Sequence, residues 1–277
     1  MGLQETVASS VERALTTQVR VSDARGRVPN RSDLRFLDGG GAALVEGTYV
    51  YADLAGSSEL AQKFDHRGVA NILRAYVVAA TKVFEAHQGG VLSFDGDRVM
   101  ALFPGDDRNV RAVKSALILN GIVTDTINPL IEKYCGQVAQ SWKLKHVVGI
   151  DCGQALVVRG GTLTKNDLIS VGGAPNIAAK LSDIRPPKAA SIYHVQAPWY
   201  SIYITEAVLS ELPEELTGPT RAPGYGAYGY NPYTDNLMEG LFGGGMGKPS
   251  MWTWCGQPNI GGTVVSVWGS DWVIRDE

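Results

Sequence analysis

Cysteine is scarce in this chain, with only three among 277 residues. Cys135, Cys152 and Cys255 lie far apart, and none of them belongs to a CxxC pair. This spacing excludes a zinc knuckle and the dense disulfide framework of a small secreted fold. Isolated thiols are typical of a reducing compartment, and we therefore expect a cytoplasmic protein.

Long apolar runs and an excess of charge of one sign are also missing. No stretch approaches the roughly 18 consecutive apolar residues of a membrane-spanning helix, and residues 1–20 have no apolar core of the kind a secretion signal needs. Lys and Arg number 25 against 28 Asp and Glu, which gives a net charge of −3. A mildly acidic chain has no general attraction to nucleic acid or to an anionic membrane. We therefore expect neither a nucleic-acid partner nor a membrane span.

Several common catalytic motifs do not occur. The chain contains no GxSxG, no HExxH and no Gly-Lys-Ser/Thr phosphate loop. The hydrolase, zinc-protease and nucleoside-triphosphatase mechanisms that depend on them are therefore excluded. The four histidines are not spaced with any nucleophile, and we interpret them as structural or surface residues.

The periodicity of the chain alternates between strand and helix. The expected elements are a strand at 48–54, a helix at 57–88, a hairpin at 91–103, a helix at 109–134, a hairpin at 145–158 that turns near Gly153, a helix at 175–184, strands within 191–209 and a closing strand at 263–274. Hairpins followed by helices predict an α+β fold, with helices packed on a mixed or mostly antiparallel sheet.

The organisation along the chain suggests one domain with additions. Residues 1–45 are expected to form an N-terminal extension that begins with a helix at 3–20, and residues 46–277 the main domain. Within that domain, residues 218–262 are rich in Gly and Tyr. Such a composition favours a surface insertion or linker, with a flap over a binding site as the alternative.

Two acidic residues are candidates for metal binding. Asp53 lies near the end of an apolar strand, where an unpaired carboxylate is costly. Asp97 directly follows the tight turn at Asp95-Gly96. If these strands are neighbours, the two carboxylates converge, and a hard divalent cation relieves their repulsion. Magnesium uses one or two protein carboxylates and completes its shell with water and substrate phosphates. The alternative is that both are solvated turn residues.

The segment after Asp53 is a candidate phosphate site. Ala55, Gly56, Ser57 and Ser58 open the expected helix, and free backbone N–H groups at a helix start bind phosphate.

A further candidate pair lies in the helix at 175–184. Asn176 and Lys180 are four residues apart and share one helix face. An amide and a cation arranged in this way can hold a sugar oxygen and a phosphate. The alternative is an ordinary capped surface helix with a solvated lysine.

Four stretches of the chain together resemble the class III nucleotidyl cyclases. They are YVYADLAGSSEL, GGVLSFDGDRVMALF, VVGIDCGQALVV and GGAPNIAAKL, and they lie within residues 48–185. The resemblance implies a ferredoxin-like catalytic domain, two divalent metal ions (Mn²⁺ or Mg²⁺) and a nucleoside triphosphate substrate. It also implies a homodimer in which two chains build each active site.

The resemblance assigns roles to individual residues. Asp53 and Asp97 match the metal-binding aspartates, and the carbonyl of Leu54 matches a supporting ligand. Asn176 matches the residue that orients the ribose, and Lys180 matches the cation that stabilises phosphate charge in the transition state. The usual residue at the last position is arginine, which differs from lysine in its fork-shaped donor geometry.

The positions that read the base depart from the purine cyclases. Ser93 stands where those enzymes usually carry lysine or glutamate, and Ile169 stands where they often carry aspartate or cysteine. Tyr51, on the same strand face as Asp53, is a candidate nucleotide contact, and Arg98 adds charge near the phosphates. This combination is similar to the stand-alone pyrimidine cyclases of bacterial Pycsar antiphage systems, whose product activates a separate effector protein.

The resemblance predicts conversion of UTP to 3′,5′-cyclic UMP and pyrophosphate. Formation of cyclic CMP from CTP is the first alternative, because one side-chain placement separates the two pyrimidines. An adenylate cyclase with an unusual pocket and a catalytically silent nucleotide-binding module also remain open.

Overall fold

The computed structural model describes residues 2–24, 26–34, 41–136, 142–162, 164–185, 199–217 and 251–275. Most of the Gly/Tyr-rich stretch, residues 218–250, lies outside the described residues.

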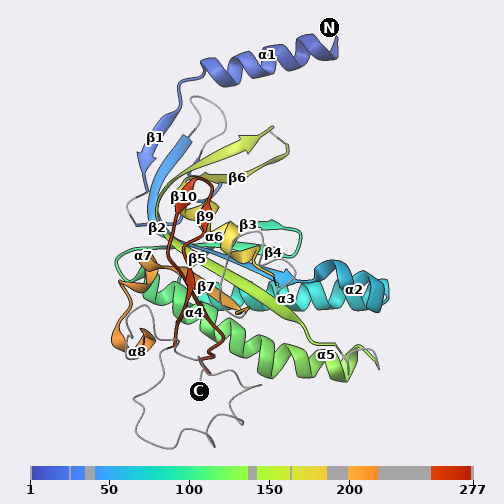
Figure 1. Ribbon diagram of the computed structural model, residues 1–277. Helices are drawn as coiled ribbons and strands as arrows, with labels where there is room; N and C mark the ends of the chain where they lie inside the picture. Colours follow the sequence, from blue (N-terminus) through green and yellow to red (C-terminus); the bar gives the residue numbers. More distant parts are fainter. Residues whose placement is uncertain are drawn as a thin grey trace, which may run out of the picture.

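A large mixed sheet runs through the described part of the chain (Figure 1). Its main path is β3-β4-β2-β5-β7-β11-β8, with β1 paired to β2 and β6 paired to β5. Neighbours are antiparallel except for the β1–β2 and β5–β7 pairs. The strands are β1 (Arg20–Asp23), β2 (Gly41–Ala55), β3 (Gly90–Asp95), β4 (Arg98–Pro104), β5 (Lys145–Gly161), β6 (Asn166–Val171), β7 (Ile202–Thr205), β8 (Thr253–Gly256) and β11 (Val267–Ser270). A separate hairpin consists of β9 (Asn259–Ile260) and β10 (Thr263–Val264).

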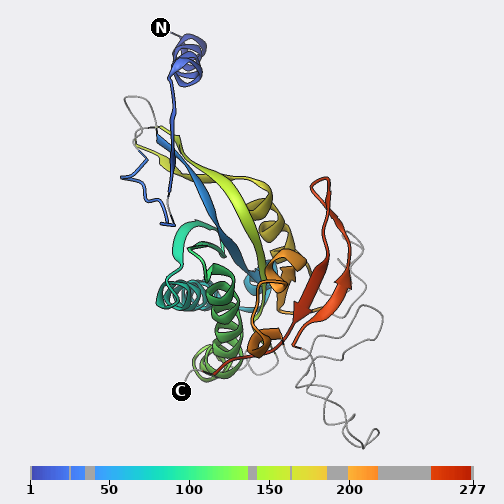
Figure 2. The ribbon, with the colours of Figure 1, turned by 90° about the vertical axis from the view of Figure 1, so that its left-hand side faces the viewer.

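Helices lie on both faces of this sheet. The helices α3 and α4 cover one face and α6 lies on the other, while α1 projects away from the body (Figures 1 and 2). The helices are α1 (Leu3–Thr16), α2 (Ser57–Lys63), α3 (His66–Ala86), α4 (Arg108–Ile122), α5 (Asn128–Tyr134), α6 (Gly173–Ser182), α7 (Glu206–Leu209) and α8 (Glu214–Thr217), with a π-helical turn at Val123–Ile127 between α4 and α5. Among the described residues, none of these helices combines the length and apolar character needed to cross a bilayer. The arrangement confirms the predicted α+β class.

The central strands are buried on both faces because each face is covered by helix. Along β2, Val50 and Ala52 pack into the core beneath α3 and α4, whereas Tyr49 belongs to a second buried cluster on the α6 side. This alternation follows from the two-residue period of a strand. Asp53 therefore continues the Tyr49 face and points to the α6 side of the sheet.

The helix α6 lies unusually close to β5. A Cβ atom at Gly149 would be 2.1 Å from the carbonyl oxygen of Ala178 and 2.5 Å from the backbone nitrogen of Ser182. Only glycine allows a helix backbone to approach a strand this closely. Gly149 thus sets the position of α6 over the centre of the sheet.

The predicted helix at 57–88 is wrong in one respect, because it is two helices. The α2 helix ends before Phe64, and α3 begins after Asp65, whose side chain accepts a hydrogen bond of 2.8 Å from the backbone N–H of Gly68. An N-cap of this kind starts a new helix and gives the chain a new direction.

The predicted hairpin at 145–158 is also wrong. The strand β5 continues through Gly153 to Gly161, and the chain reverses only afterwards, where Thr162 N–H donates to the Lys165 carbonyl at 2.7 Å. Gly153 has φ +149° and pairs with Gly47 of β2 without leaving the ladder. A glycine inside a strand permits local distortion as readily as a turn, so the sequence signal is ambiguous.

Two further boundaries differ from the expectation. The strand β2 begins at Gly41, inside the stretch assigned to the N-terminal extension, and β1 pairs with it. Part of the stretch expected to be an insertion, residues 251–262, contains β8 and β9 instead of loop. The domain boundary at residue 45 itself stays a prediction.

Candidate active site

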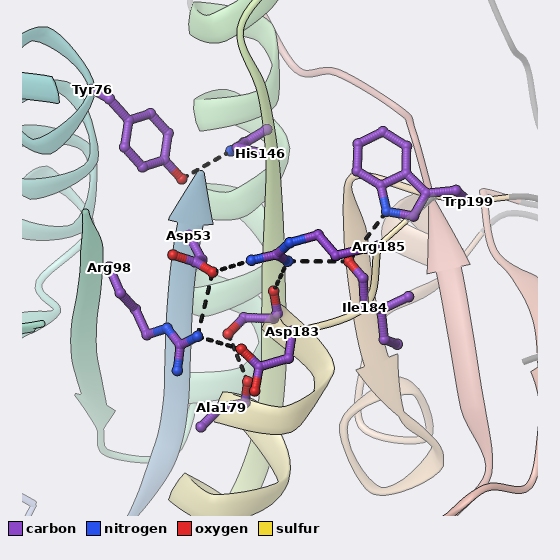
Figure 3. A network of polar contacts seen from close by, with 10 residues as sticks. Asp53, Tyr76, Arg98, His146, Ala179, Asp183, Ile184, Arg185 and Trp199 are labelled. Atoms are coloured by element: carbon purple, nitrogen blue, oxygen red, sulfur yellow. Dashed lines mark hydrogen bonds and ion pairs between the residues drawn. The ribbon is translucent and has the colours of Figure 1, made fainter. Parts of the chain in front are cut away.

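Asp53 lies near the end of β2, where its carboxylate is buried between two arginines. Its Oδ2 atom accepts a hydrogen bond of 3.3 Å from Arg98 and a closer one from Arg185 (Figure 3). Only 5% of Asp53 is exposed. Arg98 reaches it because Ala52 pairs with Val99, so the first residue of β4 lies beside Asp53. Two cations therefore balance a carboxylate that would otherwise be costly to bury.

Arg98 is held by a second carboxylate. It also forms an ion pair with Asp183, which directly follows α6. Burial alone lowers the pKa of Arg98, but the charges of Asp53 and Asp183 more than offset this and raise its pKa above the ordinary value. This network fixes the C-terminal end of α6 against the end of β2.

The sequence interpretation missed Asp183 and Arg185. The contact between Arg185 and Asp53 joins residues 132 positions apart, so no local pattern reveals it. A partial signal exists for Asp183, because Asn176, Lys180 and Asp183 follow each other at helical spacing.

Asp97 lies in the tight turn between β3 and β4, close to the same end of the sheet. Its Oδ2 atom is buried and has no hydrogen-bond partner among the described residues. The pKa of Tyr76 is raised well above its ordinary value, first by burial and then by the charges of Asp53 and Asp97. Both carboxylates therefore act on one buried phenol. A buried carboxylate oxygen without a partner is unfavourable, and a cation would satisfy it.

These two aspartates fit a magnesium or manganese ion better than a zinc ion. In the described part of the chain, no group of three or more His, Cys, Asp and Glu side chains could hold a metal. Hard divalent cations need only one or two protein carboxylates when a substrate supplies phosphate oxygens. Leu54 pairs with His146 in the ladder between β2 and β5, and its side chain is buried. Its predicted part in metal binding therefore depends on its carbonyl alone.

A neutral polar network that includes Tyr76 and His146 lies near Asp53, at the same end of β2 (Figure 3). The Nδ1 atom of His146 is 3.3 Å from the Tyr76 hydroxyl, and its Nε2 atom is 3.1 Å from Oδ1 of Asn120. The Asn120 amide nitrogen donates to the carbonyls of Asp271 and Trp272, so its oxygen is the acceptor for His146. His146 therefore carries its proton on Nε2 and accepts one hydrogen bond from Tyr76. Burial lowers the pKa of His146 to about 3, so the ring is neutral.

The predicted phosphate-binding segment follows Asp53 directly. Ala55 is the last residue of β2, and Gly56 adopts a left-handed conformation with φ +78°. The short helix α2 then starts at Ser57 and Ser58, as the sequence predicts. These residues are adjacent in the chain to the acidic end of β2, but their predicted phosphate contacts stay a prediction.

The side chains of Asn176 and Lys180 lie next to the turn between β9 and β10. A Cβ atom at Gly261, in the turn between β9 and β10, would lie 2.8 Å from Asn176 Nδ2 and 3.0 Å from Lys180 Nζ. Within the described residues, no hydrogen bond or ion pair joins either side chain to Asp53 or Asp97. Asn176 lies seven residues before Asp183, about 10 Å along the helix axis.

The candidate base-reading residues are only partly brought together. Tyr51 and Ser93 both pair with Met100, from opposite sides, and Ser93 Oγ donates to the Met100 sulfur at 3.6 Å. Ile169 is not with them, since its side chain is 49% exposed on β6. Its neighbour Leu168 is the residue that shares a buried cluster with Met100.

Comparison with known proteins finds relatives of this chain by sequence and by fold. No protein-family model matches the chain. The chain is 38% identical over 190 residues to a protein named uridylate cyclase from Rhodovulum sp. (strain MB263). This alignment covers 67% of this chain and 76% of that protein. It is 37% identical over 157 residues to one of the same name from Burkholderia cepacia, covering 57% and 67%.

The fold is also found in solved structures. The adenylyl cyclase CyaB from P. aeruginosa matches with a TM-score of 0.58 and 16% identity, over 85% of this chain and 97% of that one. At this identity the match shows the fold alone. Together with the relatives and the acidic end of β2, it shows that the chain belongs to the class III nucleotidyl cyclase family, in the group of proteins named uridylate cyclase, and is a nucleotidyl cyclase.

Proposed function

We propose that the protein converts UTP to 3′,5′-cyclic UMP and pyrophosphate. The choice of UTP as substrate is supported by the similarity of the chain to several proteins named uridylate cyclase, three of which are 35–38% identical to it. The acidic end of β2 supports the chemistry, because the unpartnered Oδ2 atom of Asp97 and the buried Asp53 carboxylate form a donor pair for hard cations.

We assign a separate role in this reaction to each of the candidate residues. Asp53 and Asp97 hold two divalent cations with help from the Leu54 carbonyl. When bound, these ions lower the pKa of the ribose 3′-hydroxyl and neutralise charge on the departing pyrophosphate. Asn176 orients the ribose, and Lys180 stabilises the negative charge that develops on the α-phosphate.

The phosphates and the base have separate contacts. The backbone from Ala55 to Ser58 and the guanidinium of Arg98 bind the triphosphate. Tyr51 and Ser93 line the base pocket on either side of Met100. A serine hydroxyl both donates and accepts hydrogen bonds, so it suits uracil and cytosine alike. Cytidylate cyclase activity is therefore the second candidate.

We further propose a homodimer with shared sites. Among the described residues, neither Asn176 nor Lys180 forms a hydrogen bond or ion pair with Asp53 or Asp97. This supports a shared site, because a second chain can supply the partner group. The role in antiphage defence and the effector activated by the product rest on the resemblance to Pycsar cyclases. The cytoplasmic location rests on the three isolated cysteines.

The experiment is to incubate the protein with Mn²⁺ and each of the four nucleoside triphosphates and to separate the products by chromatography. We expect cyclic UMP as the main product. Cyclic CMP as the main product would favour the second candidate, and cyclic AMP would contradict the assignment of the base pocket. No product from any triphosphate would contradict the proposed activity itself.

A further inference from the structure

The hairpin of β9 and β10 ends in a two-glycine turn above α6. Ile260 pairs with Thr263, which leaves Gly261 and Gly262 as the two turn residues. Both have positive φ, at +61° and +91°. A two-residue hairpin turn with positive φ at both positions is the type that glycine and asparagine adopt most readily.

The two glycines have different surroundings. A Cβ atom at Gly261 would lie 2.8 Å from Asn176 Nδ2 and 3.0 Å from Lys180 Nζ, whereas a Cβ atom at Gly262 would have nothing within 4 Å. Gly262 instead donates its N–H to Asn259 Oδ1 at 3.0 Å. The turn conformation explains a glycine at either position, but only Gly261 also makes room for two functional side chains.

The hairpin is held firmly in this place. Ile260 is buried in the same cluster as Ile177 and Leu181 of α6. At the base of the hairpin, Val265 N–H donates to the Pro258 carbonyl at 3.2 Å, and Gln257 Nε2 donates to Ser266 Oγ at 3.0 Å. The residues before Gly261 and after Asn176 are therefore packed together, which fixes the distance between the turn and the helix.

We propose that Gly261 is a positioning residue for the reaction. Its bare backbone forms a wall against which the Asn176 amide and the Lys180 ammonium are held together on α6. This inference rests on the proposed roles of Asn176 and Lys180. A methyl group at residue 261 collides only with the ends of two flexible side chains, so the fold absorbs it while both functional groups move.

Kinetic comparison of Gly261→Ala with Gly262→Ala tests this directly. Both substitutions place alanine at positive φ, and the backbone strain is greater at Gly262, whose φ of +91° lies outside the left-handed region of about +50 to +70°. Gly262→Ala therefore controls for strain in the turn. Because a displacement of about 1 Å in a catalytic group can cost about 100-fold, we expect Gly261→Ala to lower kcat by about 10- to 100-fold. We expect KM for the nucleotide to change much less. Gly262→Ala should retain wild-type kcat although its Tm falls at least as far as that of Gly261→Ala. Equal kcat losses in the two variants would contradict the proposal.

Mixing variants identifies which half of the site Gly261 serves. We expect Gly261→Ala chains to regain activity when mixed with Asp53→Ala chains, which carry intact Asn176 and Lys180. We expect no gain when they are mixed with Asn176→Ala chains. The reverse pattern would overturn the proposal. If Asp53→Ala and Asn176→Ala chains also fail to restore activity to each other, the shared site itself is contradicted, which separates the two failures.

Discussion

At the scale of single residues, the two candidate metal ligands have different surroundings. Asp53 is held by Arg98 and Arg185, whereas one oxygen of Asp97 is buried without a partner in the described part of the chain. Removing the negative charge should therefore affect the stability of the metal-free protein differently at the two positions, although activity depends on both.

We expect Asp97→Asn and Asp53→Asn each to lower cyclase activity by at least about 100-fold, because divalent-metal chemistry supplies several kcal/mol of transition-state stabilisation. In the metal-free protein, Asp97→Asn should leave the free energy of unfolding unchanged or raise it, since it removes the charge from a half-buried carboxylate with one buried, unpartnered oxygen. Asp53→Asn should lower it by about 1–3 kcal/mol, because two arginines lose their partner. Product assays and denaturant titrations measure both quantities. Near-wild-type activity in either variant would contradict the metal assignment.

The lowered pKa of His146 predicts how the free energy of unfolding depends on pH. Its folded-state pKa of about 3 lies below the ordinary 6.5, so the unfolded chain binds the additional proton between these values. Its contribution to stability is therefore complete above pH 6.5 and is lost as the pH falls from 6.5 towards 3.

Replacing His146 with Gln should make the free energy of unfolding less dependent on pH across this window, at some cost in stability at pH 7. Denaturant unfolding of both proteins at several pH values measures this. An unchanged slope would show that His146 is protonated in the folded state.

The sequence alone allowed prediction of those candidate site residues that belong to a local motif. Asp53 stands out because its carboxylate interrupts an apolar strand. Asp97 follows a tight turn, where aspartate is common, and its metal role comes from the family motif. The partners Asp183 and Arg185 could not be predicted, because their contacts depend on how the end of α6 meets β2.

At the scale of elements, the position of α6 depends on a strand glycine. Pro175 and the helical spacing predict the helix, but no local feature predicts that its backbone comes so close to Gly149 that a Cβ atom has no room. The break between α2 and α3 at Asp65 and the path of β5 through Gly153 were not predicted for the same reason: the local sequence does not determine them. An aspartate such as Asp65 can start a helix or lie within one, and a glycine in a strand can form a turn or continue the strand. Tertiary packing decides between these conformations.

Gly149→Ala should therefore displace α6. A methyl group there meets backbone atoms of Ala178 and Ser182, which cannot rotate away. Overpacking of this kind costs about 1–3 kcal/mol, and the shift of Asn176 and Lys180 should lower kcat as well. Thermal unfolding and steady-state kinetics measure the two effects.

Gly173→Ala is the matched control for this prediction. A Cβ atom at Gly173 has nothing within 4 Å, and the residue is at the start of α6. Its free energy of unfolding should stay the same or rise by a few tenths of a kcal/mol, because alanine favours helix. Equal destabilisation by both substitutions would contradict the packing argument.

At the scale of the whole molecule, the proposed reaction requires two sets of residues: the aspartates that would bind metal, and the pair Asn176 and Lys180 on α6. In the proposed site, β2 and the turn between β3 and β4 provide the carboxylates of Asp53 and Asp97, while the face of α6 that meets the β9–β10 turn provides Asn176 and Lys180. The α+β class was predictable from the order of hairpins and helices. The pairing of two chains was not, since it concerns surfaces that periodicity does not describe, and it enters through the family resemblance.

The most direct test of a shared site is to mix inactive Asp53→Ala and Asn176→Ala chains under conditions that allow exchange of subunits. Mixed dimers should contain one working site of two, so random reassortment of equal amounts should restore about a quarter of the wild-type rate of cyclic UMP formation. If the mixture stays inactive although both variants are folded and exchange subunits, the account of a site built by two chains is wrong.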